Sequence, residues 1–173
     1  WAQMNRHGAS LIERYLSGDA GQMTRLELEE LFIYAMLANV LDQGGPLDAL
    51  LASGRLERVD DWEIRARLAK WPDWLEDIHT NDLSIRDYAF REITPFLSHQ
   101  GIPRVLCPEG EWVCAPDETI PPEYVELSED PRFRALLVYR RGMMNMTAGD
   151  HENALAEAEE LLELIRARLE VLD

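Results

Sequence analysis

The chain has 173 residues, of which 46% are hydrophobic, and its 33 acidic and 17 basic side chains give a net charge of −16. This length fits one domain, and the apolar content excludes a disordered chain. The acidic balance argues against nucleic-acid binding, which needs clustered Lys and Arg. Two Cys exclude a disulfide framework, and the longest uncharged apolar run, residues 31–41, is too short to span a membrane.

Apolar residues recur every three or four positions along most of the chain, which predicts an all-α, mainly bundle-like domain. Thr24 followed by Glu27 is typical of a capping box, and the strongly apolar segment behind it predicts a central helix. Pro72 is expected to divide one periodic run into two short helices that meet at Trp71. The first six predicted helices span residues 5–16, 25–43, 47–53, 60–71, 72–80 and 84–99.

Helix boundaries follow from local stop and start residues. Gly18, Gly54 and Gly101 each follow a periodic segment and are expected to end a helix. Asp60 or Asp61 is expected to cap the helix at 60–71, and Asp82 or Ser84 the helix at 84–99.

The hydrophobic period changes to two at residues 104–107 and 111–114, on either side of Pro108-Glu109-Gly110. This pattern predicts one small β-hairpin insert over 104–114. Cys107 and Cys114 are a candidate disulfide: a tight turn would place Cys114 opposite Arg104 instead, whereas a wider loop or an extracytoplasmic location would favour the bond. The helix and hairpin over 84–114 are also similar to a winged helix, with a helix of no net charge that favours protein over DNA contact.

The end of the chain is expected to form a long antiparallel helical hairpin, with helices at 131–147 and 151–172 around a turn at 148–150. The equidistant register predicts that Arg141 faces Glu157 and Arg134 faces Glu163. The basic cluster of the first helix is therefore expected to neutralise the acids of the second: Arg132, Arg134, Arg140 and Arg141 against Glu157, Glu159, Glu160 and Glu163. The last helix is expected to bury one apolar stripe: Ala154, Ala158, Leu161, Leu162, Ile165, Leu169 and Leu172.

Signatures of chemistry are sparse. His7, His79, His99 and His151 are scattered without zinc-ligand spacing, and no phosphate-binding loop or nucleophile motif occurs. The sequence therefore predicts no catalytic, cofactor-binding or metal-binding residue. His79 with Asp82 is a candidate polar pair. The tryptophans at 71 and 74 are expected in the core, and the neighbouring acids Asp73, Glu76 and Asp77 are a candidate carboxylate site.

Two resemblances add to this. Gly142, Gly149-Asp150 and Ala154-Leu155 follow the spacing of one tetratricopeptide-type unit. The segments at 47–56, 64–71 and 130–137, ahead of a long closing helix, resemble uncharacterised bacterial proteins with one N-terminal membrane helix and a helical domain outside the cytoplasm. The second resemblance implies a location rather than an activity.

Together these features favour a single non-enzymatic domain over 1–173 that acts in interaction or sensing, as the soluble part of a membrane-anchored bacterial protein. A protein partner or self-association is expected, without cofactor or nucleic acid, and an extracytoplasmic location is favoured over a cytoplasmic one. The alternative is a cytosolic acidic adaptor or inhibitor that binds a basic protein. A third hypothesis is a small hydrolase with a carboxylate site.

Overall fold

The computed structural model describes residues 1–38, 40, 45–102 and 122–172. Within these ranges 87% of the residues are helical and no strand occurs, which confirms the all-α class. The predicted β-hairpin at 104–114, with Cys107 and Cys114, lies outside the described residues. The α-helices are α1 (Ala2–Leu16), α2 (Arg25–Met36), α3 (Pro46–Ala52), α4 (Trp62–Tyr88), α5 (Thr94–His99), α6 (Pro122–Glu126) and α7 (Pro131–Leu172).

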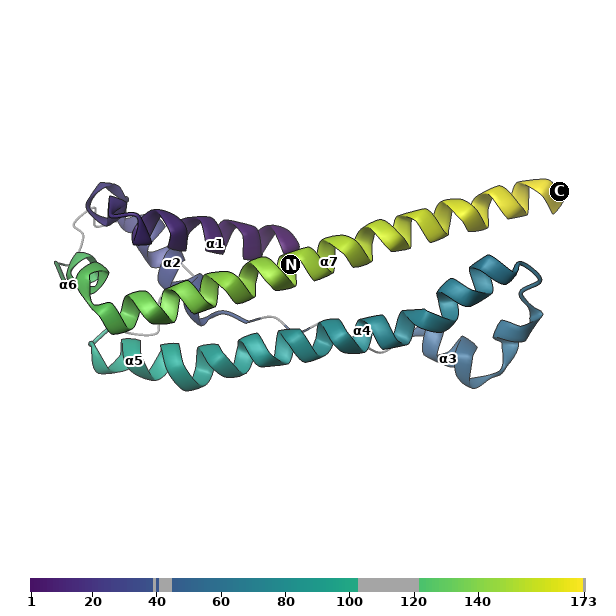
Figure 1. Ribbon diagram of the computed structural model, residues 1–173, viewed down its shortest axis with the longest axis horizontal. Coiled ribbons are helices and arrows are strands. Elements are labelled where there is room, and N and C mark those ends of the chain that lie inside the picture. The colour runs from purple at the N-terminus through teal and green to yellow at the C-terminus, as the bar shows by residue number, and fades with distance from the viewer. Residues whose placement is uncertain (39, 41–44, 103–121, 173) are drawn as a thin grey trace, which may run out of the picture.

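Helix α7 runs the whole length of the molecule (Figure 1). Helix α1 lies against its N-terminal half, and α4 runs beside it in the opposite direction. Short 3-10 turns follow α1, α3 and α6, at Asp19–Gln22, Arg55–Arg58 and Leu127–Glu129. The N-terminus lies near the middle of α7, and the C-terminal end of α7 projects beyond α1 (Figure 1).

Aromatic rings from five helices form the centre of the core. Phe32 of α2 meets Tyr124 of α6 edge to face, with ring centroids 4.9 Å apart, and Phe96 of α5 stacks on Phe133 of α7 at 5.5 Å. Tyr15 of α1 lies edge-on to Phe133 at 5.9 Å and donates a 2.7 Å hydrogen bond to the carbonyl of Tyr124. Such pairs contribute about 0.5–1.5 kcal/mol each beyond their buried area. These contacts join α1 and α2 to α5, α6 and α7 in one core.

Several local signals act as predicted. The capping box is present: the backbone N–H of Glu27 donates to the Thr24 hydroxyl and that of Thr24 to the Glu27 carboxylate. Asp61 caps α4 by accepting the backbone N–H groups of Glu63 and Ile64. Gly18, Gly54 and Gly101 follow α1, α3 and α5 with φ of +97°, +66° and +74°, a conformation that glycine adopts without a Cβ clash.

Helix α2 is shorter than the predicted range 25–43, because Leu37 is already extended. Its last carbonyls are satisfied from elsewhere in the chain: the guanidinium of Arg140 on α7 donates to the carbonyls of Tyr34 and Leu37. A cation at this position also complements the negative end of the helix dipole. The central location of α2 is confirmed, since Leu28, Leu31, Phe32 and Ala35 are fully buried.

The predicted helix break at Pro72 is wrong: α4 continues through it from Trp62 to Tyr88. A π-helical turn at Ala89–Ile93 then leads directly into α5. Proline removes one backbone hydrogen bond and costs about 3 kcal/mol. Burial on both sides of Pro72, at Ile64 and at Ile78, offsets that cost. Asp82, predicted as a helix start, instead lies buried inside α4.

The predicted C-terminal hairpin is also wrong, because α7 is one helix of 42 residues. The segment expected to turn is held straight by its contacts: Thr147 and Ala148 are buried, and Asp150 accepts a 3.0 Å hydrogen bond from the side-chain amide of Asn81 on α4. Gly149 inside a helix costs only about 1 kcal/mol, which these contacts exceed. The two-helix hairpin implied by the tetratricopeptide resemblance is therefore a single helix.

The charge pairs expected across that hairpin are replaced by others. Arg141 lies 3.7 Å from Glu13 of α1, and Arg134 donates to the carbonyls of Ser128 and Leu16. Glu157 lies 3.4 Å from Arg67 of α4. The charges of α7 thus bind it to α1 and α4 rather than to itself.

Two glycines in helices are expected to respond oppositely to substitution by Ala. A Cβ at Gly8 of α1 would lie 2.8 Å from Tyr34 Cβ and would also clash with Met144 Cε, so α1 and α2 would have to separate. Gly8→Ala is expected to destabilise the fold by about 1–3 kcal/mol. Gly142→Ala in α7 meets no atom within 4 Å and is expected to stabilise it by about 0.5–1 kcal/mol.

Urea unfolding of both variants beside the native chain provides the measurement. A stabilising Gly8→Ala would contradict the close approach of α1 to α2.

Candidate interaction groove

A groove of about 510 Å³ lies between α4 and α7. A second depression of about 300 Å³ adjoins it and shares Trp74 and Asp77. We call the two together the α4/α7 groove. Its lining residues are Arg67, Lys70, Trp71, Asp73, Trp74, Asp77, Ile78, Thr80, Asn81, Asp150 and Glu157.

Helical periodicity brings the lining residues of α4 together. Arg67, Trp71, Trp74 and Ile78 follow one another at spacings of three and four, which places them on one face of the helix. The two tryptophans are half-buried and lie edge to face, with ring centroids 5.7 Å apart at 79°. The prediction that they belong to the core is therefore only partly correct, because their exposed surface forms a wall of the groove.

Polar contacts close one end of the groove. Asn81 donates to Asp150 at 3.0 Å, and His151 Nε2 lies 3.2 Å from Asp82 Oδ1. Asp82 is 2% exposed and the His151 side chain 12%, so this polar contact between α4 and α7 lies almost out of solvent. Sequence reasoning paired Asp82 with His79 and missed His151. Only the unbroken course of α7 brings residues 82 and 151 together.

The electrostatic balance of the groove is negative. Arg67 lies within 3.4–3.6 Å of three carboxylates: Glu63 of α4, and Glu157 and Glu160 of α7. Further along, Asp73, Asp77 and Asp150 line the groove, against one additional base, Lys70. Aromatic faces beside carboxylates are the chemistry that attracts ammonium and guanidinium groups. Of the candidate carboxylates Asp73, Glu76 and Asp77, the first and last are lining residues.

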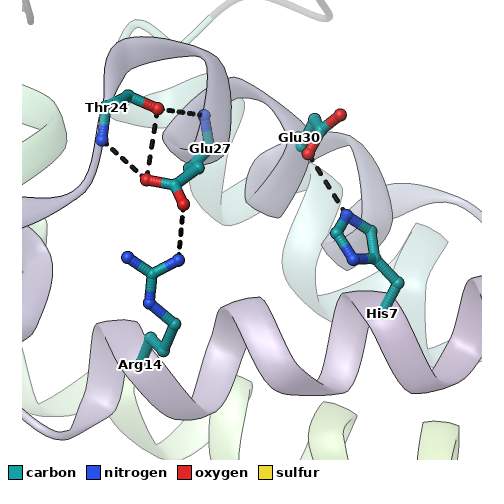
Figure 2. Close-up of polar contacts among 5 residues, drawn as sticks. All are labelled: His7, Arg14, Thr24, Glu27 and Glu30. Carbon is teal, nitrogen blue, oxygen red and sulfur yellow. Dashed lines mark hydrogen bonds and ion pairs between the residues drawn. The ribbon is translucent and has the colours of Figure 1, made fainter.

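A second polar cluster joins α1 to α2 (Figure 2). Glu27 of the capping box also receives the guanidinium of Arg14 at 2.5 Å, and His7 Nε2 lies 3.2 Å from Glu30. Hydrogen bonds from Arg14, and then from the backbone of Thr24, lower the pKa of Glu27 to about 2. This cluster joins α1 to α2 through charged and polar side chains.

The depressed pKa of Glu27 predicts acid sensitivity of the α1–α2 contact. Its ionised form is the bound form, so its contribution is complete above the unfolded pKa of about 4.5 and is lost as the pH falls towards about 2. Glu27→Gln is expected to flatten the decline of stability with pH between these values. Arg14→Met, which leaves Thr24 in place, is expected to flatten it in part. Urea unfolding at a series of pH values measures both, and an unchanged profile in Glu27→Gln would contradict the assignment.

Arg140 is the largest fully buried side chain in the described part of the chain. Its guanidinium donates to the carbonyls of Ile85 on α4 and of Tyr34 and Leu37 at the end of α2, while its Nε has no hydrogen-bond partner among the residues that the structure describes. Burial lowers the pKa of Arg140 to about 10, which leaves it charged at neutral pH. The prediction that it neutralises acids of the last helix is wrong, because its partners are carbonyls.

Among the described residues, no cluster of three or more His, Cys, Asp or Glu side chains is arranged to hold a metal ion. None of the helices in those ranges has the length and apolar character needed to cross a membrane.

The described residues form an all-helical domain with an acidic, aromatic-walled groove, which is lined mainly by α4 and also by Asp150 and Glu157 of α7. Comparison of the chain with protein-family models, with curated proteins and with solved structures finds no match.

Proposed function

We propose that this chain is a protein-interaction domain that holds a basic segment of a partner protein in the α4/α7 groove. The observation that carries the proposal is the pair of half-exposed tryptophans, Trp71 and Trp74, beside Asp73, Asp77 and Glu157. A Lys or Arg side chain can lie over an indole face and meet a carboxylate at once. The net charge of −16 adds long-range attraction for a basic partner.

Binding of a fluorescently labelled peptide of alternating Arg and Gly, followed by anisotropy, tests the proposal. Trp74→Ala and Asp77→Asn are expected to weaken binding at least about tenfold, because each removes one component of the recognition. Glu163→Gln is the matched control, since it removes one exposed carboxylate of α7 that does not line the groove. If Asp77→Asn and Glu163→Gln lost the same affinity for the peptide, binding would depend only on the overall charge of the protein, and the groove would be refuted as the binding site.

The proposal extends to location. The resemblance of segments 47–56, 64–71 and 130–137 to bacterial proteins with an N-terminal membrane helix supports a domain that is anchored to a membrane and acts outside the cytoplasm. Fractionation of cells that express the complete reading frame tests this. Recovery of the protein in the membrane fraction, with the domain accessible to protease added to spheroplasts, supports the anchored form. Recovery in the cytosol would favour the alternative of a cytosolic adaptor or inhibitor.

A further inference from the structure

The C-terminal part of α7 carries a stripe of exposed leucines. Leu155, Leu162 and Leu169 are 61%, 45% and 57% exposed, and they follow one another at intervals of seven residues. Intervals of seven place side chains almost directly above one another on a helix, so the three form one line about 21 Å long. Three exposed leucines aligned on one face of a helix are a candidate contact site.

The contacts of α7 with α4 use another side of the helix. Arg67 of α4 meets Glu157 and Glu160, Arg168 lies 2.5 Å from Asp61, and Leu161 is 6% exposed. These positions are rotated from the leucine stripe by roughly 100° or more at 100° per residue. The N-terminal end of α1 lies near Glu152 of α7, which pairs with Arg6 at 2.7 Å. The leucine stripe therefore begins where the cover of α1 stops.

The stripe has the spacing of a coiled-coil seam. The half-buried Ala158 and Ile165 lie between the leucines, so the apolar positions 155, 158, 162, 165 and 169 alternate steps of three and four. This is the pattern that packs one helix against another by knobs into holes. Glu159 and Arg166 flank the seam on its solvent side, and both are exposed.

The charged residues beside the stripe, Glu159 and Arg166, favour a second copy of this chain as the partner that covers it. Leu155 and Leu169 are each seven residues from Leu162, on opposite sides. A two-fold axis beside Leu162 would bring Leu155 of one copy against Leu169 of another in antiparallel orientation. The same axis sets Glu159, three residues before Leu162, opposite the partner's Ile165, so the partner's Arg166 is only one residue, about 1.5 Å, further along the helix and within reach of the Glu159 side chain. A parallel pair would instead align like charges at each of these levels.

We propose that two copies of this chain associate by antiparallel pairing of the α7 segment 155–169, with Leu162 at the centre and Glu159 within reach of the partner's Arg166 at both ends. The interface is isologous, so one stripe suffices to close a dimer. Its short length places it among weak and reversible associations. This surface lies on a different side of α7 from the α4/α7 groove, so the dimer and the groove are independent.

Sedimentation equilibrium over a hundredfold range of protein concentration measures the association of residues 1–173. The native chain is expected to pass from monomer to dimer. Leu162→Glu is expected to remain monomeric, because it brings two carboxylates together at the axis. Ala167→Glu, an equal added charge at an exposed position on the opposite side of the helix, is expected to dimerise as the native chain does. A native chain that stays monomeric at every concentration would overturn the proposal.

Charge reversal tests the orientation with variants that leave the apolar seam intact. Glu159→Arg and Arg166→Glu are each expected to weaken dimerisation about tenfold, because each places two like pairs across the interface. The double variant is expected to restore it, since both pairs become opposite again. Failure of the double variant to restore dimerisation would refute the antiparallel register.

The two proposals fail separately in these experiments. Leu162→Glu is expected to bind the basic peptide with native affinity, and Trp74→Ala is expected to dimerise with native affinity. Loss of peptide binding in Leu162→Glu would overturn the independence of the two surfaces.

Discussion

Arg140→Ala is expected to lower the free energy of unfolding by about 3–5 kcal/mol, a large share of the 5–15 kcal/mol typical of a domain. The substitution leaves the part-buried carbonyls of Tyr34 and Leu37 without the Arg140 donor, and the buried Ile85 carbonyl with only the backbone N–H of Ala89. Each unsatisfied buried acceptor costs about 1–3 kcal/mol. Arg140→Ala also leaves a cavity in place of a large buried side chain and removes the cation at the C-terminal end of α2.

Two further variants of this region separate charge from volume. Arg140→Met keeps most of the volume but supplies no donor, so it is expected to be nearly as damaging as Arg140→Ala. Arg141→Ala removes the adjacent arginine, whose contact with the exposed Glu13 spans 3.7 Å, and is expected to change stability by less than about 1 kcal/mol. Urea unfolding monitored by circular dichroism gives the three values. Native stability in Arg140→Met would show that the guanidinium bonds contribute nothing.

Leu161→Ala is expected to destabilise the fold by about 2–4 kcal/mol, whereas Leu162→Ala is expected to cost less than about 1 kcal/mol. The two leucines are adjacent and chemically identical, but Leu161 is 6% exposed and Leu162 is 45% exposed. Truncation of the buried leucine leaves a cavity on the side of α7 that faces α4. Truncation of the exposed one removes little buried surface.

The comparison of Leu161→Ala with Leu162→Ala also tests how α7 is rotated about its own axis. The apolar periodicity predicts that both leucines are buried, so equal damage would support that prediction and contradict the structure. The measurement is thermal or urea unfolding at low protein concentration, because Leu162 lies in the proposed dimer seam. At high concentration, additional destabilisation of Leu162→Ala alone would support the dimer.

Much of the fold could be predicted from local chemistry. Thr24, Glu27 and Asp61 bind backbone groups within three residues of themselves, and Gly18, Gly54 and Gly101 end their helices through a positive φ. Such effects involve neighbours in the chain, so they are readable without tertiary structure. The candidate groove was not predicted, because the expected break at Pro72 placed Trp71 and Trp74 in separate helices and both were expected in the core; the unbroken α4 puts them on one face.

The sequence by itself thus determined the helical class, most helix starts and stops, and the acidic surface. Only the tertiary structure decided that α4 passes Pro72, that α7 passes Gly149, and which leucines of α7 are covered. Inside a helix, Gly149 costs about 1 kcal/mol and Pro72 about 3 kcal/mol. These costs are outweighed by contacts between residues about seventy positions apart, Asn81 with Asp150 and Asp82 with His151. Those contacts exist only once α4 and α7 lie side by side, so no local pattern in the sequence reports them.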